Sequence, residues 1–159
     1  MRFLLPFLML ALCGCCEAQK TNVSLEKRQE AIAKEIISIE YTFGETVFQL
    51  NNTKAVGFVV KAESLTDRLD KTSKELDTLG RFPIGLRKAT LEKLDDDEKA
   101  LAKLTSSKKI DLLQPEAVKI TMPAAAKYFS ARASVIRKAG LYWSNSIDTN
   151  GVEPPKMTR

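Results

Sequence analysis

A chain of 159 residues, of which 44% are apolar, suits one domain with a sizeable buried core. It contains no histidine, and its three cysteines lie between residues 13 and 16. The lack of histidine and cysteine in the rest of the chain therefore excludes a structural zinc site, a haem ligand and a Ser-His or Cys-His catalytic pair there. The net charge of +5 fits a well-solvated surface, and in a chain with an export signal it does not indicate binding to nucleic acid.

The start of the chain is typical of an export signal. Met1 and Arg2 give a short charged beginning, and an apolar run follows from residue 3 to residue 12. This run is too short to span a bilayer, and small residues come after it, so it indicates a cleaved secretory signal. We expect the signal to occupy residues 1–14 and the protein to be exported.

Two cleavage sites are compatible with this signal. Residues 12–15, Leu-Cys-Gly-Cys, resemble the lipobox of bacterial lipoproteins, in which an apolar residue and two small residues precede a cysteine. The resemblance implies that Cys15 becomes the first mature residue and carries acyl chains that anchor the protein to a membrane. The alternative is the small-x-small stretch at residues 16–18. It would end the signal at residue 18 and give a soluble secreted protein that begins at Gln19.

Residues 15–23 are polar and are expected to form a flexible tether. Apolar residues then recur at steps of three and four: Leu25, Ile32, Ile36, Ile39, Phe43 and Leu50. This spacing predicts a helix from Ser24, a favourable N-cap, to Leu50, with a narrow coiled-coil-like seam that another helix must cover. The stretch Asn51-Asn52-Thr53 is expected to form the turn that follows.

A second helix is expected from about Lys54 to Leu79. Its apolar seam is interrupted only by Thr72 and consists of Phe58, Ala62, Leu65, Leu69, Leu76 and Leu79. Gly80 and Pro83 are expected to end this helix, because glycine favours a C-terminal cap and proline cannot continue the hydrogen-bond ladder.

A third helix is expected from about Ile84 to Thr105, with a weaker seam because Asp97 occupies an apolar position. The seam residues are Leu86, Thr90, Leu94, Leu101 and Leu104. The acidic run at residues 95–98 is interpreted as a solvated helix face. Four consecutive helical acids point around the axis, so they do not converge on a metal ion.

The fourth helical region is expected to be broken. Pro115 would open a short piece that ends at Ile120, and Pro123 would mark a second start, since proline is tolerated in a first turn. The second piece would run to about Ile147, with a seam formed by Met122, Ala125 or Ala126, Phe129, Ile136 and Trp143. Residues 148–159 are expected to form a disordered tail.

The candidate binding residues are aromatic or basic. If the interior holds a small apolar ligand, the residues expected to line it are Phe43, Phe48, Phe129 and Trp143, although helical spacing makes ordinary core packing the simpler interpretation. Basic residues could face an anionic surface of the cell envelope, and they are Lys108, Lys109, Lys127, Arg132, Arg137 and Lys138. Arg132 lies on a seam row, so its stem could instead pack at the rim with its head in solvent.

No catalytic motif is present, so we expect a non-enzymatic protein that needs no metal or cofactor. The predicted fold is an all-α antiparallel bundle of three long helices plus a broken fourth, at residues 24–147. The leading hypothesis is a cell-envelope lipoprotein, anchored through Cys15, whose bundle is an interaction or structural module. The alternative is a soluble secreted helical protein that binds a small apolar ligand inside the bundle.

Overall fold

The structure is a computed structural model that describes residues 13–105 and 111–141, with side chains described over 24–103 and 111–141. These residues form helices α1 (Cys13–Phe48), α2 (Ala55–Leu79), α3 (Ile84–Thr105) and α4 (Pro115–Lys138). A 3₁₀ turn, η1 (Asn52–Lys54), connects α1 to α2. All regular structure in the described residues is helical, which confirms the all-α prediction. Most of the predicted signal and the predicted tail lie outside the described residues.

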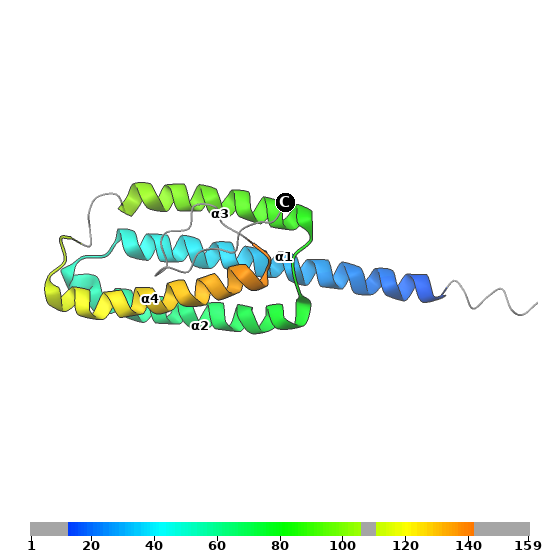
Figure 1. The fold of residues 1–159 in the computed structure, drawn as a ribbon, viewed down its shortest axis with the longest axis horizontal. Coiled ribbons are helices and arrows are strands. Elements are labelled where there is room, and N and C mark those ends of the chain that lie inside the picture. The colour runs from blue at the N-terminus through cyan, green and yellow to red at the C-terminus, as the bar shows by residue number, and fades with distance from the viewer. Residues whose placement is uncertain (1–12, 106–110, 142–159) are drawn as a thin grey trace, which may run out of the picture.

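Successive helices run in opposite directions, so α1 and α3 point one way and α2 and α4 point the other (Figure 1). Helix α1 packs against both α2 and α3, and α4 packs along α2. The N-terminal part of α1 extends beyond the ends of the other helices (Figure 1). We call residues 13–28 the stalk, because Gln29 is the first buried residue among the described side chains of α1.

The predicted seams of α1 and α2 lie in the core, with one exception. The buried seam residues are Ile32, Ile36, Ile39, Phe43 and Leu50 of α1, and Phe58, Ala62, Leu65, Leu69, Leu76 and Leu79 of α2. Thr72 is buried as well. Its hydroxyl donates to the Arg68 carbonyl, so its burial leaves no unpaired donor. Leu25 is 38% exposed, because it belongs to the stalk, where no neighbouring helix covers it.

Helix α3 buries its seam less completely. Thr90 and Leu94 are buried, whereas Leu86 and Leu101 are half-buried. A Cβ at Gly44 would lie 3.3 Å from Leu101 Cδ1, so the glycine allows α1 and α3 to approach closely at this point. The weaker pattern predicted for α3 therefore corresponds to a thinner contact with the core.

The start of α1 differs from the sequence prediction. Residues 15–23, expected to be a flexible tether, are helical, and Ser24 lies inside α1 instead of capping its start. No glycine or proline occurs in this stretch, and its Glu, Ala, Gln and Lys residues are strong helix formers. The helix therefore continues without a break from the stalk into the core.

The prediction of a broken fourth helix was wrong, because α4 is continuous through Pro123. Pro115 occupies the first turn, where proline is favourable. Pro123 removes one backbone hydrogen bond, but it lies on the exposed side of α4, where water can bind the carbonyl that is released.

Helix α4 also ends earlier than predicted. Gly140 has a φ of 71°, and the Leu141 N–H donates to the Ile136 carbonyl at 2.8 Å. This arrangement is a Schellman motif, which ends the helix at Lys138 instead of Ile147. Leu141 is buried and covers the end of the helix.

The buried face of α4 is shifted from the predicted one over most of the helix, although the predicted Ile136 is buried. Met122 and Ala126 are exposed, Ala125 and Phe129 are half-buried against the core, and Trp143 lies outside the described residues. The buried side chains are Ala117, Thr121, Ala124, Tyr128, Arg132, Val135 and Ile136. The prediction failed because it placed the charged Arg132 at the rim, and the true face includes Arg132.

We expect Ile39→Ala and Leu69→Ala each to lower the free energy of unfolding by about 2–5 kcal/mol, because truncating a buried side chain leaves a cavity. The matched control is Val60→Ala on α2, where the side chain is 63% exposed and the change should be within about 0.5 kcal/mol. Urea unfolding followed by circular dichroism measures all three. Core variants that behave like the control would show that these faces are not buried.

Candidate functional site: a buried charge cluster and a polar groove

Three aromatic rings meet in the interior between α1 and α4. The Phe43 and Tyr128 rings are stacked, with their centroids 3.8 Å apart and an interplanar angle of 5°. Phe129 meets both rings edge-on, with centroid distances of 5.4 Å to Phe43 and 5.5 Å to Tyr128. Such contacts suit aromatic packing, but they also carry the Tyr128 hydroxyl into the interior, where it needs a partner.

That partner is Glu40 of α1. The Tyr128 hydroxyl donates to Glu40 Oε1 at 2.9 Å, and Arg132 Nε donates to the same oxygen at 2.6 Å. The side chains of Arg132 and Glu40 are only 9% and 11% exposed. Because Tyr128 and Arg132 are one helical turn apart on α4, both donors reach one carboxylate.

Burial and the Glu40 charge determine the ionisation of this cluster. Burial, and next the negative charge of Glu40, raise the pKa of Tyr128 well above its ordinary value, so the phenol keeps its proton. Burial alone would lower the pKa of Arg132, but the charge and hydrogen bond of Glu40 outweigh it, and the pKa is raised. Both groups therefore remain donors to Glu40, which suits a role in holding helices together.

Part of the acidic run of α3 turns toward this cluster, which contradicts its interpretation as a wholly solvated face. Asp97 and Glu98, together with Glu40 and Arg132, contribute to the lining of a cavity of about 10 Å³. That volume is close to the space that one water molecule needs. The Glu98 carboxylate also raises the pKa of Arg132, after the larger effects of Glu40 and Tyr128.

Asp97 is bound on one side only. Its Oδ1 accepts from Lys93 Nζ at 3.1 Å, while its Oδ2 is buried with no hydrogen-bond partner among the described residues. Asp96 is exposed, and Asp95 pairs with Lys99. Across residues 24–103 and 111–141, no three acidic or thiol side chains are placed together as metal ligands.

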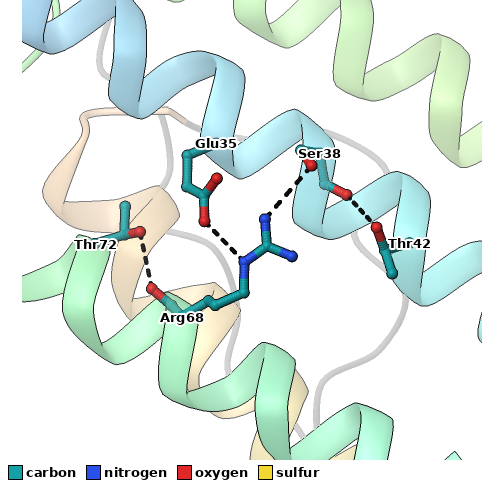
Figure 2. Close-up of polar contacts among 5 residues, drawn as sticks. All are labelled: Glu35, Ser38, Thr42, Arg68 and Thr72. Carbon is teal, nitrogen blue, oxygen red and sulfur yellow. Dashed lines mark hydrogen bonds and ion pairs between the residues drawn. The ribbon is translucent and has the colours of Figure 1, made fainter.

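A second polar feature lies along the junction of α1 and α2. Arg68 of α2 donates to two side chains of α1, from Nε to Glu35 Oε1 at 2.8 Å and from Nη2 to Ser38 Oγ at 3.5 Å (Figure 2). The Thr42 hydroxyl donates to the Ser38 carbonyl, and the Thr72 hydroxyl donates to the Arg68 carbonyl (Figure 2). These contacts set Glu35 opposite Arg68 in the antiparallel pair.

Toward the C-terminal end of α1, this junction opens into a groove of about 530 Å³. Its lining residues are Thr42, Glu45, Thr46, Gln49 and Leu50 of the α1 side, and Thr53, Lys54, Gly57, Phe58 and Lys61 of the α2 side. The groove stays open because Gly57 has no side chain and the threonines opposite it are short. We call it the α1–α2 groove.

The structure brings only part of the predicted ligand-lining set together. Phe43 and Phe129 are in contact inside the protein. Phe48 is 44% exposed and lines a separate surface groove of about 470 Å³ beside the α1–α2 turn. Trp143 lies outside the described residues, and Cys15 is placed by its backbone in the first turn of α1.

Sequence reasoning missed Glu40, Tyr128 and Arg132 as one cluster, because their sequence separation gives no signal of contact. The α1–α2 groove did leave a signal. Polar residues recur on α1 at steps of three and four, and they are Glu35, Ser38, Thr42, Glu45, Thr46 and Gln49. Such a stripe is typical of a solvated helix face, so the sequence alone did not distinguish the groove from ordinary surface.

Comparison of the chain with family models, with curated proteins and with solved structures found no match. Within residues 13–105 and 111–141, no helix has both the length and the hydropathy needed to cross a lipid bilayer.

We expect Arg132→Met to lower the free energy of unfolding by about 3–5 kcal/mol, because it leaves the Glu40 carboxylate buried without its partner. Arg137→Met, at an exposed position of the same helix, is the matched control and should change stability by less than about 0.5 kcal/mol. Adding Glu40→Gln to Arg132→Met should recover part of the loss, since the uncompensated charge is removed. Equal urea midpoints for Arg132→Met and its control would contradict this role.

The Arg68 hydrogen bond lowers the pKa of Glu35 from its ordinary value of 4.5. A carboxyl whose pKa is lower in the folded state stabilises the fold above its unfolded-state pKa, and this contribution is lost as the pH falls through the folded-state pKa. The contribution is thus complete at neutral pH and disappears below pH 4.5. It should stay under about 1 kcal/mol, because the Glu35 side chain is 40% exposed.

Glu35→Gln should therefore be less stable than the parent protein at neutral pH, and the two should converge as the pH falls into the acidic range. Urea unfolding at a series of pH values measures this difference. Glu63→Gln, at an exposed position of α2, is the control and should follow the parent at every pH. A stability difference for Glu35→Gln that is independent of pH would rule out the Arg68 contact as its cause.

Proposed function

We propose that the protein is an exported, non-enzymatic lipoprotein of the bacterial cell envelope, anchored through Cys15, with a helical body that acts as an interaction or structural module. The observation that supports this most directly is the place of Cys15 in the first turn of the stalk. A lipid attached there would sit at the free end of a helix, away from the packed core. Several acyl chains at one cysteine are enough for stable membrane attachment.

The stalk gives this anchor a definite geometry. From Cys15 to Gln29, where the buried part of α1 begins, the helix rises about 21 Å. The body would therefore stand clear of the lipid headgroups on a continuous helix instead of a flexible tether. We take α1 to α4 to form one antiparallel bundle, in keeping with their alternating directions (Figure 1).

The buried polar groups of the interior fit a binding or structural module better than an enzyme. The buried polar groups Glu40, Tyr128 and Arg132 bind one another across α1 and α4, and they leave room only for about one water molecule beside them. A catalytic group has to meet a substrate in a cleft. The described surface grooves are instead the α1–α2 groove and the one beside Phe48.

The alternative hypothesis, a secreted protein that holds an apolar ligand in its interior, has less support. The space beside Phe43 and Phe129 is about 10 Å³. Pockets for small organic ligands are typically about 300–1,000 Å³. The space beside Phe43 and Phe129 is thus too small for such a ligand.

The test is metabolic labelling with a fatty acid in a bacterial host. Label should enter the mature protein and be lost in Cys15→Ala, because the thiol carries the acyl chains. Cys16→Ala is the matched control, since it changes the neighbouring thiol and should keep the label. A mature N-terminus at Gln19, read by mass spectrometry, would eliminate the lipoprotein and favour the soluble secreted form.

A further inference from the structure

The α1–α2 groove combines a mixed polar rim with an apolar floor. The apolar residues that line it, Leu50 and Phe58, are largely buried and form its floor. Above them, the hydroxyls of Thr42 and Thr46 each donate to a carbonyl of their own helix, at 2.8 and 2.7 Å. Each hydroxyl oxygen can still accept a hydrogen bond.

Two ammonium groups, from Lys54 at the N-cap of α2 and from Lys61 within α2, give the groove its positive charge. Lys54 and Lys61 both line it and are exposed, and neither belongs to an ion pair among the described residues. Glu45 is the acid that lines the same groove, and it too is outside those ion pairs. The groove therefore offers two cationic donors, one anionic acceptor and the amide of Gln49, which can both donate and accept.

In the other half of the α1–α2 junction, a side chain fills the space between the helices. There Arg68 reaches across to Glu35 and Ser38 and closes the space between the helices (Figure 2). Stepping one heptad along each antiparallel helix sets Thr42 opposite Lys61. Gln49 and Lys54 lie farther along, at the turn between the two helices. No carboxylate stands at position 42 or 49, and no ion pair in the described part of the chain includes either lysine.

We propose that the α1–α2 groove binds an acidic saccharide chain that carries a carboxylate on alternate sugars. Sugar hydroxyls both donate and accept, which matches the threonine, glutamine and glutamate side chains of the rim. The C–H face of a pyranose ring fits the apolar floor. Lys61 lies seven residues after Lys54, the N-cap of α2, and seven residues of α-helix rise about 10 Å, which is close to the length of a disaccharide.

This inference gives a ligand class to the interaction module proposed above, so it rests on that view of the body, but it does not require acylation of Cys15. It also fits the proposed orientation. The groove lies at the C-terminal end of α1, whereas the stalk projects from the opposite end of the molecule (Figure 1). An anchored protein would present the groove away from the membrane, where a polymer and not a lipid headgroup is within reach.

The experiment is a calorimetric titration of the full-length protein, held in detergent micelles, with a hyaluronan hexasaccharide as the probe. This oligosaccharide alternates glucuronic acid with N-acetylglucosamine. A hexasaccharide of N-acetylglucosamine alone is the uncharged comparison, and a hexaglutamate peptide is the acidic comparison without sugar rings. We expect the hyaluronan probe to bind at least tenfold more tightly than either, with an affinity that falls as salt is raised.

Three variants locate the site. Lys54→Gln and Lys61→Gln should each weaken binding about fivefold or more, while Lys74→Gln, at an exposed position farther along α2, should leave it unchanged. Gly57→Leu is the sharpest test. A Cβ at Gly57 meets no atom within 4 Å, so the side chain should fill the groove and abolish binding. The fold should tolerate it, because glycine is a poor residue inside a helix.

Each outcome is decisive. Hyaluronan binding that survives Gly57→Leu, or that is matched by the uncharged hexasaccharide, would overturn the proposal. Equal binding of hexaglutamate would overturn it in favour of an acidic protein partner, and no binding of hyaluronan at millimolar concentration would overturn it outright. Acyl labelling of Cys15 is a separate measurement, so failure of the anchor and failure of the groove are distinguishable.

Discussion

The contact between Glu40 and Arg132 decides which side of α4 faces the interior. The backbone of α4 lies along α2, and its polar link to α1 is made by Arg132 and Tyr128 at the Glu40 carboxylate. A buried ion pair often contributes little net stability, because removing two charges from water is costly. We infer that its main effect here is specificity. Turning α4 by one residue would bring Met122 and Phe129 inward, but it would separate Arg132 from the Glu40 carboxylate of α1.

This balance also explains where sequence reasoning succeeded. Ile32 to Phe43 and Phe58 to Leu76 were placed correctly, because a run of aliphatic and aromatic residues at one spacing leaves no rival face. Helix α4 has two rival faces that both carry apolar residues, and the buried one also includes the charged Arg132. Choosing between the two faces requires knowing that Glu40 of α1 lies beside Arg132. That contact depends on how the helices pack, and the sequence pattern of α4 does not reveal it.

Other differences have equally local causes. Pro123 was read as a helix start, but on an exposed face a proline inside a helix leaves only a carbonyl that water can bind. The prediction of Leu25 as a core residue was wrong, because the spacing of apolar residues does not show how far the neighbouring helices extend. The α1–α2 groove was missed for the opposite reason. Its rim is polar, and what makes it a hollow is the absence of a side chain at Gly57, opposite short threonines.

The uninterrupted course of α1 has a consequence for anything joined to its beginning. Neither glycine nor proline occurs between Cys15 and Phe43, so the helix has no built-in swivel. The rotation of the whole body about the α1 axis is therefore fixed relative to the first turn of α1. One residue added to the stalk would raise the body by about 1.5 Å and swing it through roughly 100°. Seven added residues make about two full turns and would nearly restore the original orientation. The length of the stalk therefore sets the rotation of the body about the helix axis as well as its distance from the attachment point.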